Sequence, residues 1–411
     1  MTNSMRTCYL QACRTFIAVC CLLLFSSLVF ADEQVKAVPA EYRSKNFLLT
    51  TDLDEEEAEA LLTRLETMLR IVSRYWGAPS RKTIRLFVAE DLGRWPPGRL
   101  PPEGETAIRQ GGITLARGMR YGRRFDFDAI VYSSAAGGTP QHEAVHAYCY
   151  QTFGETGPTW YAEGMAEMGN YWDENDPTVT CPDYIIEFLK RSPRPTVEEI
   201  TVSDDVSGDG WRKYAWRWAL CHFLANNTNY AERFRVLGSN YLSGGKPSFE
   251  RTFETTLPEL EFEFDFFLDH LERGFDVGQC SWDWSARFRE LKEKPIAAKV
   301  QADRGWQSGA IRVIQGQRIA YRATGEWQLL KEELEPGESV CTADGLDDGS
   351  GKLVATIRTS TGLIKEFELG SKGVLEISES GDLYLRCREP WSLIRDNSGT
   401  VNVEFQASPP N

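Results

Sequence analysis

The sequence predicts an α+β protein, in which a mixed sheet with helices is followed by a helical half and then by an all-β sandwich. Residues 54–76 carry apolar side chains every three or four positions between two strand-like segments, a pattern typical of an amphipathic helix between strands. Residues 139–273 have mainly helical periodicity. From about residue 296 the pattern changes to short alternating runs separated by turn residues, which predicts a sandwich.

The first part of the chain is predicted to form the mixed sheet. Asn46–Asp52 and Thr83–Ala89 have the composition of strands, and Asp54–Trp76 between them begins with acidic residues, as helices do. Short strands are also predicted at Gly112–Ala116 and Asp128–Ser133. The apolar face of the helix is predicted to comprise Ala58, Leu61, Leu62, Leu65, Met68, Leu69 and Val72.

Two neighbouring segments are predicted to lack regular structure. Residues 32–45 are expected to be a mobile leader, and the proline pairs between residues 96 and 102 predict a loop.

The helical half is predicted to follow Asn170 and to surround a polar loop at residues 203–210. Residues 32–273 are taken as one domain, 274–296 as a linker, and 297–411 as the sandwich domain. Helices are predicted at Cys181–Lys190, Trp211–Asn226, Tyr230–Tyr241 and Leu257–Arg273. The strands of the sandwich are predicted around residues 311–316, 318–325, 352–358, 374–381, 383–387 and 401–405.

Residues 1–31 have the pattern of a secretory signal peptide. Arg6 and Arg14 precede an apolar run over residues 16–30, and cleavage is predicted after Ala31. The mature protein is therefore expected to be secreted or periplasmic. No comparable apolar run recurs, so no membrane span is expected in the mature form.

Six of the ten cysteines remain after the predicted cleavage, an even number that permits three disulfides in an exported protein. Cys341 and Cys387 lie in one predicted domain and are the best single pair. Cys149 lies off the face of the two motif histidines, which favours a buried thiol or a disulfide over a metal ligand. The formal charge of −14 argues against binding to nucleic acid or to an anionic membrane.

The central motif is the H-E-x-x-H sequence from His142 through Glu143 to His146. Residues four apart lie on one face of a helix, so both imidazoles can point at one metal ion. Glu143 then lies where a general base would act on a water molecule at that metal. The same motif can also arise by chance on an amphipathic helix. The chain has only four histidines, and the presence of two in this motif favours a metal site.

The motif is predicted to lie in the first turns of a helix. Thr139 is the predicted N-cap, Pro140 the first helical residue and Gly154 the end of the helix. A second helix is predicted to begin near Thr159 and to carry Glu163, which is the candidate third ligand.

The stretch from His142 to Glu167, including Trp160-Tyr161-Ala162-Glu163-Gly164-Met165-Ala166, resembles the gluzincins, zinc metallopeptidases that include thermolysin and aminopeptidase N. The resemblance implies that His142, His146 and Glu163 bind zinc and that Glu143 is the general base. It also implies that Glu167 orients His142 from behind the metal ligands.

The same resemblance implies two further features of the catalytic domain. An edge strand before the zinc helix, here Gly111–Leu115, would pair with extended substrate backbone; the alternative is an ordinary edge strand. A Tyr or His from the helical half would stabilise the oxyanion, for which Tyr214 and His222 are the candidates. Packing in the apolar core is the alternative for each of them.

The C-terminal domain resembles the bacterial calcium-dependent galactose-binding lectins. The matching segments are residues 305–309, 323–327, 351–354 and 381–405. This resemblance implies a calcium ion held by Glu389, Asp396 and Asn397 with the Leu393 carbonyl, and a carbohydrate bound through that calcium. The alternative is that residues 396–399 form a simple turn before the last strand. Glu389 stands where the lectins have Asp, and Arg388 and Arg395 add positive charge beside the loop.

The resulting expectation is an exported zinc peptidase that hydrolyses peptide bonds in protein or peptide substrates. The alternative is a secreted glycan-binding protein in which the zinc domain is inert or structural. Glu143 favours the enzyme, because a structural zinc site has no use for a general base.

Overall fold

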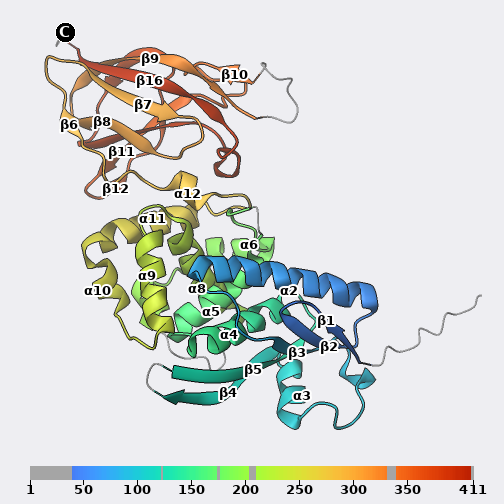
Figure 1. The fold of residues 1–411 in the computed structure, drawn as a ribbon. Helices are drawn as coiled ribbons and strands as arrows, with labels where there is room; N and C mark the ends of the chain where they lie inside the picture. The colour runs from blue at the N-terminus through green and yellow to red at the C-terminus, as the bar shows by residue number, and fades with distance from the viewer. Residues whose placement is uncertain (1–38, 122–123, 174–175, 203–209, 331–338, 409–411) are drawn as a thin grey trace, which may run out of the picture.

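The computed structural model describes residues 39–121, 124–173, 176–202, 210–330 and 339–408. Helices and strands both make up the described chain, so the broad α+β class predicted from the sequence is confirmed (Figure 1). The predicted signal peptide, residues 1–31, lies outside the described residues. None of the helices in the described part of the chain combines the length and apolar character needed to span a lipid bilayer.

The N-terminal sheet has the strand order β1-β2-β3-β5-β4. Strands β2, β3 and β5 are parallel, whereas β1 and β4 run antiparallel to their neighbours at the two edges of the sheet. The sheet therefore ends in an antiparallel strand, β4, which borders the helix that carries the H-E-x-x-H motif, α4 (Thr139–Phe153) (Figure 1). Its strands are β1 (Ala40–Arg43), β2 (Phe47–Thr51), β3 (Ile84–Ala89), β4 (Gly112–Tyr121) and β5 (Arg124–Ser134).

Helix α2 (Glu55–Trp76) connects β2 to β3 and buries the apolar face that the sequence predicts. Asp54 caps it by accepting the Glu57 backbone N–H, and Gly77 ends it in the left-handed conformation at φ 68°. All seven residues predicted on the apolar face are buried, so this prediction is confirmed.

The sequence prediction missed two elements in this half. Residues 40–43, expected to be part of a mobile leader, form β1 and pair with β2. The proline-rich segment expected to be a loop leads into α3 (Pro102–Arg109), in which Pro102 occupies the first turn. Proline is compatible with that position because the first N–H groups of a helix have no partner within it.

The helical half follows the two helices of the motif region, α4 (Thr139–Phe153) and α5 (Thr159–Tyr171). The four predicted helices are present, and α7, α10 and α12 are additional short ones. The remaining helices are α6 (Asp183–Arg191), α7 (Val197–Val202), α8 (Trp211–Asn226), α9 (Ala231–Leu242), α10 (Phe249–Phe253), α11 (Leu257–Asp269) and α12 (Val277–Cys280).

The C-terminal residues form two facing sheets with their own buried core, as the alternating pattern predicts. One sheet contains β7 (Ile296–Gln301), β9 (Arg318–Gln328), β10 (Val340–Cys341), β14 (Lys372–Glu376) and β16 (Ser398–Ala407). The other contains β6 (Arg289–Glu290), β8 (Gln307–Val313), β11 (Leu353–Thr359), β12 (Gly362–Leu363), β13 (Phe367–Glu368) and β15 (Gly381–Cys387).

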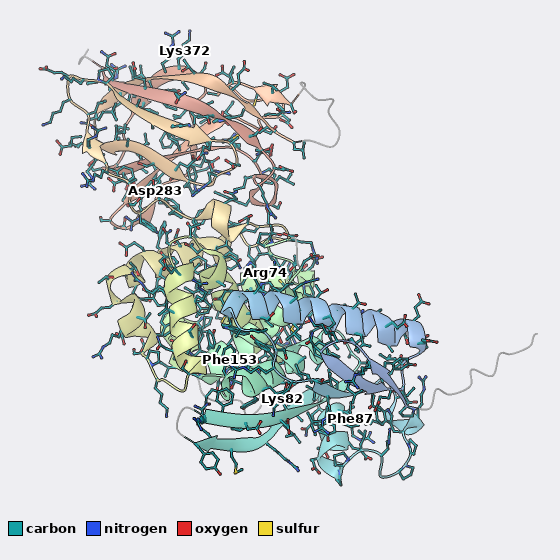
Figure 2. All side chains as sticks on the ribbon, viewed as in Figure 1. Arg74, Lys82, Phe87, Phe153, Asp283 and Lys372 are labelled. Carbon is teal, nitrogen blue, oxygen red and sulfur yellow. The ribbon has the colours of Figure 1, made fainter. Side chains whose placement is uncertain are left out.

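The segment 274–296 was expected to be a linker, but its first part, residues 275–282, is packed. Trp282 is 1% exposed and its ring contacts Tyr384 of the sandwich at 4.6 Å. Trp391 contacts Phe266 of α11 at 5.2 Å, so aromatic rings of both units join one core. Figure 2 shows Asp283 at this junction, with Lys372 on the far side of the sandwich.

Candidate metal centre

Helix α4 presents the H-E-x-x-H motif in its first two turns. Its N-cap is Gly138, one residue before the predicted Thr139, and Pro140 lies in the first turn as expected. Gly154 ends the helix at φ 78°, a left-handed conformation that glycine adopts at little cost. Almost all of α4 is buried, so the motif lies inside the molecule rather than on a solvated face.

Helix α5 lies close to both α4 and α8 because glycines face its neighbours. A Cβ at Gly164 would lie 2.5 Å from the Cys221 sulfur on α8, and one at Gly169 would lie 2.4 Å from the Val145 side chain on α4. Real Cβ atoms do not approach other atoms so closely, so a larger side chain would push α5 away. Gly169, which faces α4, therefore helps to bring α5 and its Glu163 carboxylate close to α4.

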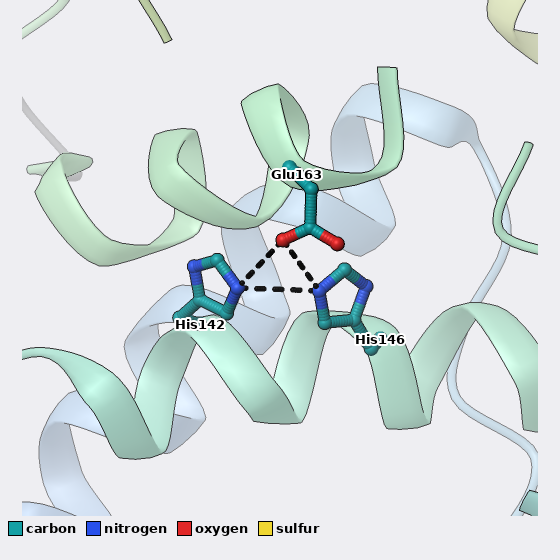
Figure 3. A group of neighbouring side chains, drawn as sticks. All are labelled: His142, His146 and Glu163. Carbon is teal, nitrogen blue, oxygen red and sulfur yellow. Dashed lines mark hydrogen bonds and ion pairs between the residues drawn. The ribbon is translucent and has the colours of Figure 1, made fainter. Parts of the chain in front are cut away.

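The side chains of His142, His146 and Glu163 converge on one point (Figure 3). The two Nε2 atoms are 3.2 Å apart, and Glu163 Oε2 lies 3.2 Å from the Nε2 of His142 and 3.5 Å from that of His146. Ligands on a tetrahedral zinc at about 2.0–2.1 Å are roughly 3.3–3.4 Å from one another. Two imidazoles and one carboxylate are also a common zinc donor set, so these residues fit a zinc ion.

Glu167 lies behind His142, on the side away from the converging atoms. His142 Nδ1 donates to Glu167 Oε1 at 3.0 Å, and Asn170 Nδ2 donates to Glu167 Oε2 at 3.2 Å. With its proton on Nδ1, His142 directs the lone pair of Nε2 toward the converging atoms. The carboxylate thus has the position expected of a group that orients a metal ligand.

The electrostatics of the cluster favour charged carboxylates. Burial raises the pKa of the Glu163 carboxyl, but the neighbouring His146 and His142 outweigh burial and hold that pKa below its usual range. For Glu167, hydrogen bonding to His142 likewise outweighs burial, and its pKa is lowered. Burial lowers the pKa of His142, yet the hydrogen bonds to Glu163 and Glu167 raise it overall.

Glu143 is held apart from the three converging side chains. Thr114 Oγ1 on β4 contacts Glu143 Oε2 at 2.8 Å and the Glu143 carbonyl oxygen at 2.7 Å. A Cβ at Gly112 would lie 3.0 Å from Glu143 Cγ, so the bare backbone of β4 leaves room for the carboxylate. The edge strand therefore sets the orientation of this side chain.

Sequence reasoning missed the supporting residues Thr114, Asn170 and Gly138. A Cβ at Gly138 would lie 1.3 Å from Asn170 Oδ1, so only glycine fits where the Asn170 amide passes the start of α4. These residues belong to no recognisable motif. The Thr114–Glu143 contact and the approach of Asn170 to Gly138 join positions 29 and 32 residues apart in sequence. The only local signal near these residues was the glycine and proline before the motif, which mark the start of α4.

The two oxyanion candidates occupy different surroundings. The Tyr214 ring on α8 lies edge-on to His142 at 5.7 Å between centroids, so this tyrosine borders the candidate metal centre. His222, two turns further along α8, instead packs in the core, where its ring stacks on Phe267 and contacts the tilted ring of Trp218. His222 therefore matches the alternative considered for both residues, which is that the side chain packs in the apolar core.

We expect His222 to contribute to acid sensitivity. Burial lowers its pKa to about 4, against an opposing effect of Asp176, from an ordinary value of 6.5. The unfolded chain therefore takes up this proton first, and stability is lost as the pH falls from about 6.5 toward 4. In His222→Phe, the melting temperature should fall less steeply over this window. An unchanged slope in a pH series of thermal melts would contradict the assignment.

The candidate calcium residues lie on the loop between β15 and β16. Asn397 is buried and its Oδ1 accepts the Leu330 backbone N–H at 3.2 Å, whereas Asp396 is exposed. The carbonyl of the buried Glu389 accepts from Arg386 at 3.0 Å. In the described residues, the only group of three or more His, Cys, Asp or Glu close enough to hold a metal is His142, His146 and Glu163. The binding of calcium at this loop, and of a carbohydrate through that calcium, remains a prediction.

The predicted disulfide between Cys341 and Cys387 is not formed, because Cys387 is a free thiol. The two residues belong to opposite sheets of the sandwich, at β10 and at the end of β15. Burial raises the pKa of the Cys387 thiol, with a smaller contribution from Cys341. Cys149 is likewise a buried thiol, as one of the two interpretations expected, and burial raises its pKa.

No protein-family model and no curated protein matches the chain. Among solved structures, the chain is similar to an EclA N-terminal domain described as a PllA-like lectin. The match has 16% identity, covers 27% of this chain and 95% of that one, and has a TM-score of 0.23. Two structures of a functionally unknown conserved protein from Bacillus anthracis str. Ames, one of them a mutant, match at 13% and 14% identity.

The two Bacillus anthracis matches cover 28% and 29% of this chain and 22% of the other chain, each with a TM-score of 0.17. At these TM-scores, none of the three likenesses bears on the function of this chain.

Proposed function

We propose that this chain is an exported zinc-dependent peptidase of the gluzincin type, which hydrolyses peptide bonds in protein or peptide substrates with Glu143 as general base. The observation that carries the proposal is the convergence of two imidazoles and a carboxylate at 3.2–3.5 Å, with a further carboxylate held outside them. A purely structural zinc site is usually closed by four protein ligands and does not need that further carboxylate.

The zinc would be held by His142, His146 and Glu163. When bound, zinc supplies a Lewis acid that polarises the scissile carbonyl and lowers the pKa of water. Glu167 maintains the tautomer of His142, because its carboxylate accepts the Nδ1 proton.

Glu143 has the role of moving a proton. Its carboxylate accepts a proton from the attacking water and then delivers it to the leaving amine. The Thr114 hydroxyl lies 2.8 Å from Oε2 and 2.7 Å from the Glu143 carbonyl oxygen, and these contacts restrain the carboxylate. A positioned general base of this kind contributes typically about 10²–10⁴ to the rate.

Two further groups favour a peptide substrate. Tyr214 borders His142, where its hydroxyl could donate to an oxygen that becomes negative during the reaction. Strand β4 forms the edge of its sheet beside α4, so its backbone groups are open to an extended peptide. Ile113 on this strand is 41% exposed, which offers an apolar contact beside the pairing groups.

The test uses purified protein that begins at Asp32. Elemental analysis should find about one zinc per chain, since the three ligands form one site. A fluorogenic peptide library of mixed sequence should be cleaved, and mass spectrometry of the products should locate the scissile bonds. Zinc-replete protein that cleaves no member of the library would contradict the proposal and leave a binding protein with an inert zinc domain as the better interpretation.

A further inference from the structure

A pocket formed by α5, α7, α9, α10 and α11 lies at the far end of the edge strand from Thr114. Its volume is about 650 Å³, within the range typical of ligand sites. Buried aromatic rings line it: Trp160 at the start of α5, Tyr241 near the end of α9 and Phe249 at the start of α10. Trp160 contacts Phe249 edge-on at 5.5 Å and Tyr241 at 6.3 Å, so the rings are fixed by one another.

Three carboxylates from three different helices surround these rings. Glu198 lies on α7, Glu250 on α10 and Glu261 on α11, and all three line the pocket. None of the three takes part in an ion pair within the described chain. Among the described residues of the lining, Lys246 is the one cationic side chain, so carboxylates dominate the charge of this part of the pocket.

The edge strand links the metal centre to this pocket. Near its start, Thr114 contacts the general base Glu143. Near its end, Arg120 contacts Glu155 at 3.4 Å, and its side chain passes close to Gly244. Glu155 and Gly244 both line the pocket. The six residue-to-residue steps from Thr114 to Arg120 span about 20 Å of strand.

We propose that this pocket binds a basic side chain, arginine or lysine, of a peptide whose backbone extends along β4 from the metal centre. The inference rests on the proposed peptidase function and specifies its substrate class. The carboxylates offer charge-assisted hydrogen bonds to the cationic head, and the aromatic rings form an apolar wall for the aliphatic stem of the side chain. At about 3.3 Å per residue, the basic residue would lie roughly five to seven residues from the scissile bond.

The experiment uses a series of variants of one cleaved library peptide. Each variant has a single arginine at a different distance from the scissile bond, on either side of it. Norleucine at the same position is the reference, because it has an unbranched chain without charge. At one position roughly five to seven residues away, arginine should raise kcat/KM by about tenfold, as expected for hydrogen bonds to a charged group. This preference should shrink in high salt.

Variants then locate the preference in the pocket. Glu198→Gln, Glu250→Gln and Glu261→Gln combined should abolish it while leaving cleavage of the norleucine peptide unchanged. Glu232→Gln removes an exposed carboxylate on α9 outside the pocket, and it should retain the preference. If the triple variant fails to fold, Glu250→Gln and Glu261→Gln are tested singly and should each weaken the preference.

Binding is also measured without turnover, by fluorescence anisotropy of labelled alanine–serine peptides with one arginine or one norleucine. Tighter binding of the arginine peptide, lost in the triple variant, supports the pocket assignment even if no peptide is cleaved. Equal binding of both peptides, or a preference that survives the triple variant, overturns it. Cleavage without any preference for a distant basic residue overturns the pocket assignment and leaves the peptidase proposal standing.

Discussion

Replacing Glu143 with glutamine is expected to lower kcat/KM by about 10²–10⁴ while the protein retains its zinc. Glutamine has nearly the shape of glutamate and keeps an oxygen that can accept from Thr114 Oγ1. It cannot accept the proton of the attacking water as a carboxylate does. The three converging side chains are untouched, so zinc content and melting temperature should stay close to those of the wild type.

The measurement is hydrolysis of the best library peptide, with zinc quantified in the same samples. Thr114→Val is the graded comparison, because it keeps the carboxylate but removes the hydroxyl that orients it. Thr114→Val should therefore lose less activity than Glu143→Gln. Wild-type turnover by Glu143→Gln would rule out this residue as the general base.

Replacing His146 with alanine is expected to abolish both stoichiometric zinc and peptide hydrolysis. A site with one imidazole and one carboxylate lacks the third protein ligand that catalytic zinc sites have. Zinc that binds the folded chain stabilises it by about 4 kcal/mol at a free concentration a thousandfold above Kd. Adding zinc to metal-free wild type should thus raise the melting temperature by on the order of 10 °C.

The same titration distinguishes ligands from supporting residues. Glu163→Ala should resemble His146→Ala, with no zinc-dependent rise in melting temperature. Glu167→Gln keeps an acceptor for His142 Nδ1 but loses the charge, so its zinc affinity should fall by about 10–100-fold. Glu232→Ala, remote from the metal centre, is the control. A full zinc-dependent shift in His146→Ala would show that zinc binds elsewhere.

The elements of the candidate site that are local in sequence could be predicted before the structure. His142 and His146 lie one helical turn apart, so any helix through them places both on one face. Glycine and proline marked both ends of α4, with an error of one residue at the N-cap. The seven buried residues of α2 followed from their spacing alone, because a surface helix buries one stripe.

Some local segments were predicted wrongly because tertiary pairing overrides composition. Residues 40–43 have no strong strand pattern, yet they pair with β2, which offers a free edge. The segment around Trp282 lacks helical or strand periodicity and looked like a linker. It is packed because rings from α11 and the sandwich surround it.

The sequence by itself determined which residues can share a helix face and which runs alternate as strands, since these depend on periods of 3.6 and 2 residues. The tertiary structure decided which faces meet: Glu163 over the two histidines, Thr114 on Glu143, and Asn170 beside Gly138. It also decided that carboxylates of three helices gather around Trp160. Such contacts depend on how closely whole helices and strands approach one another. This approach is governed by packing against residues distant in sequence rather than by local spacing.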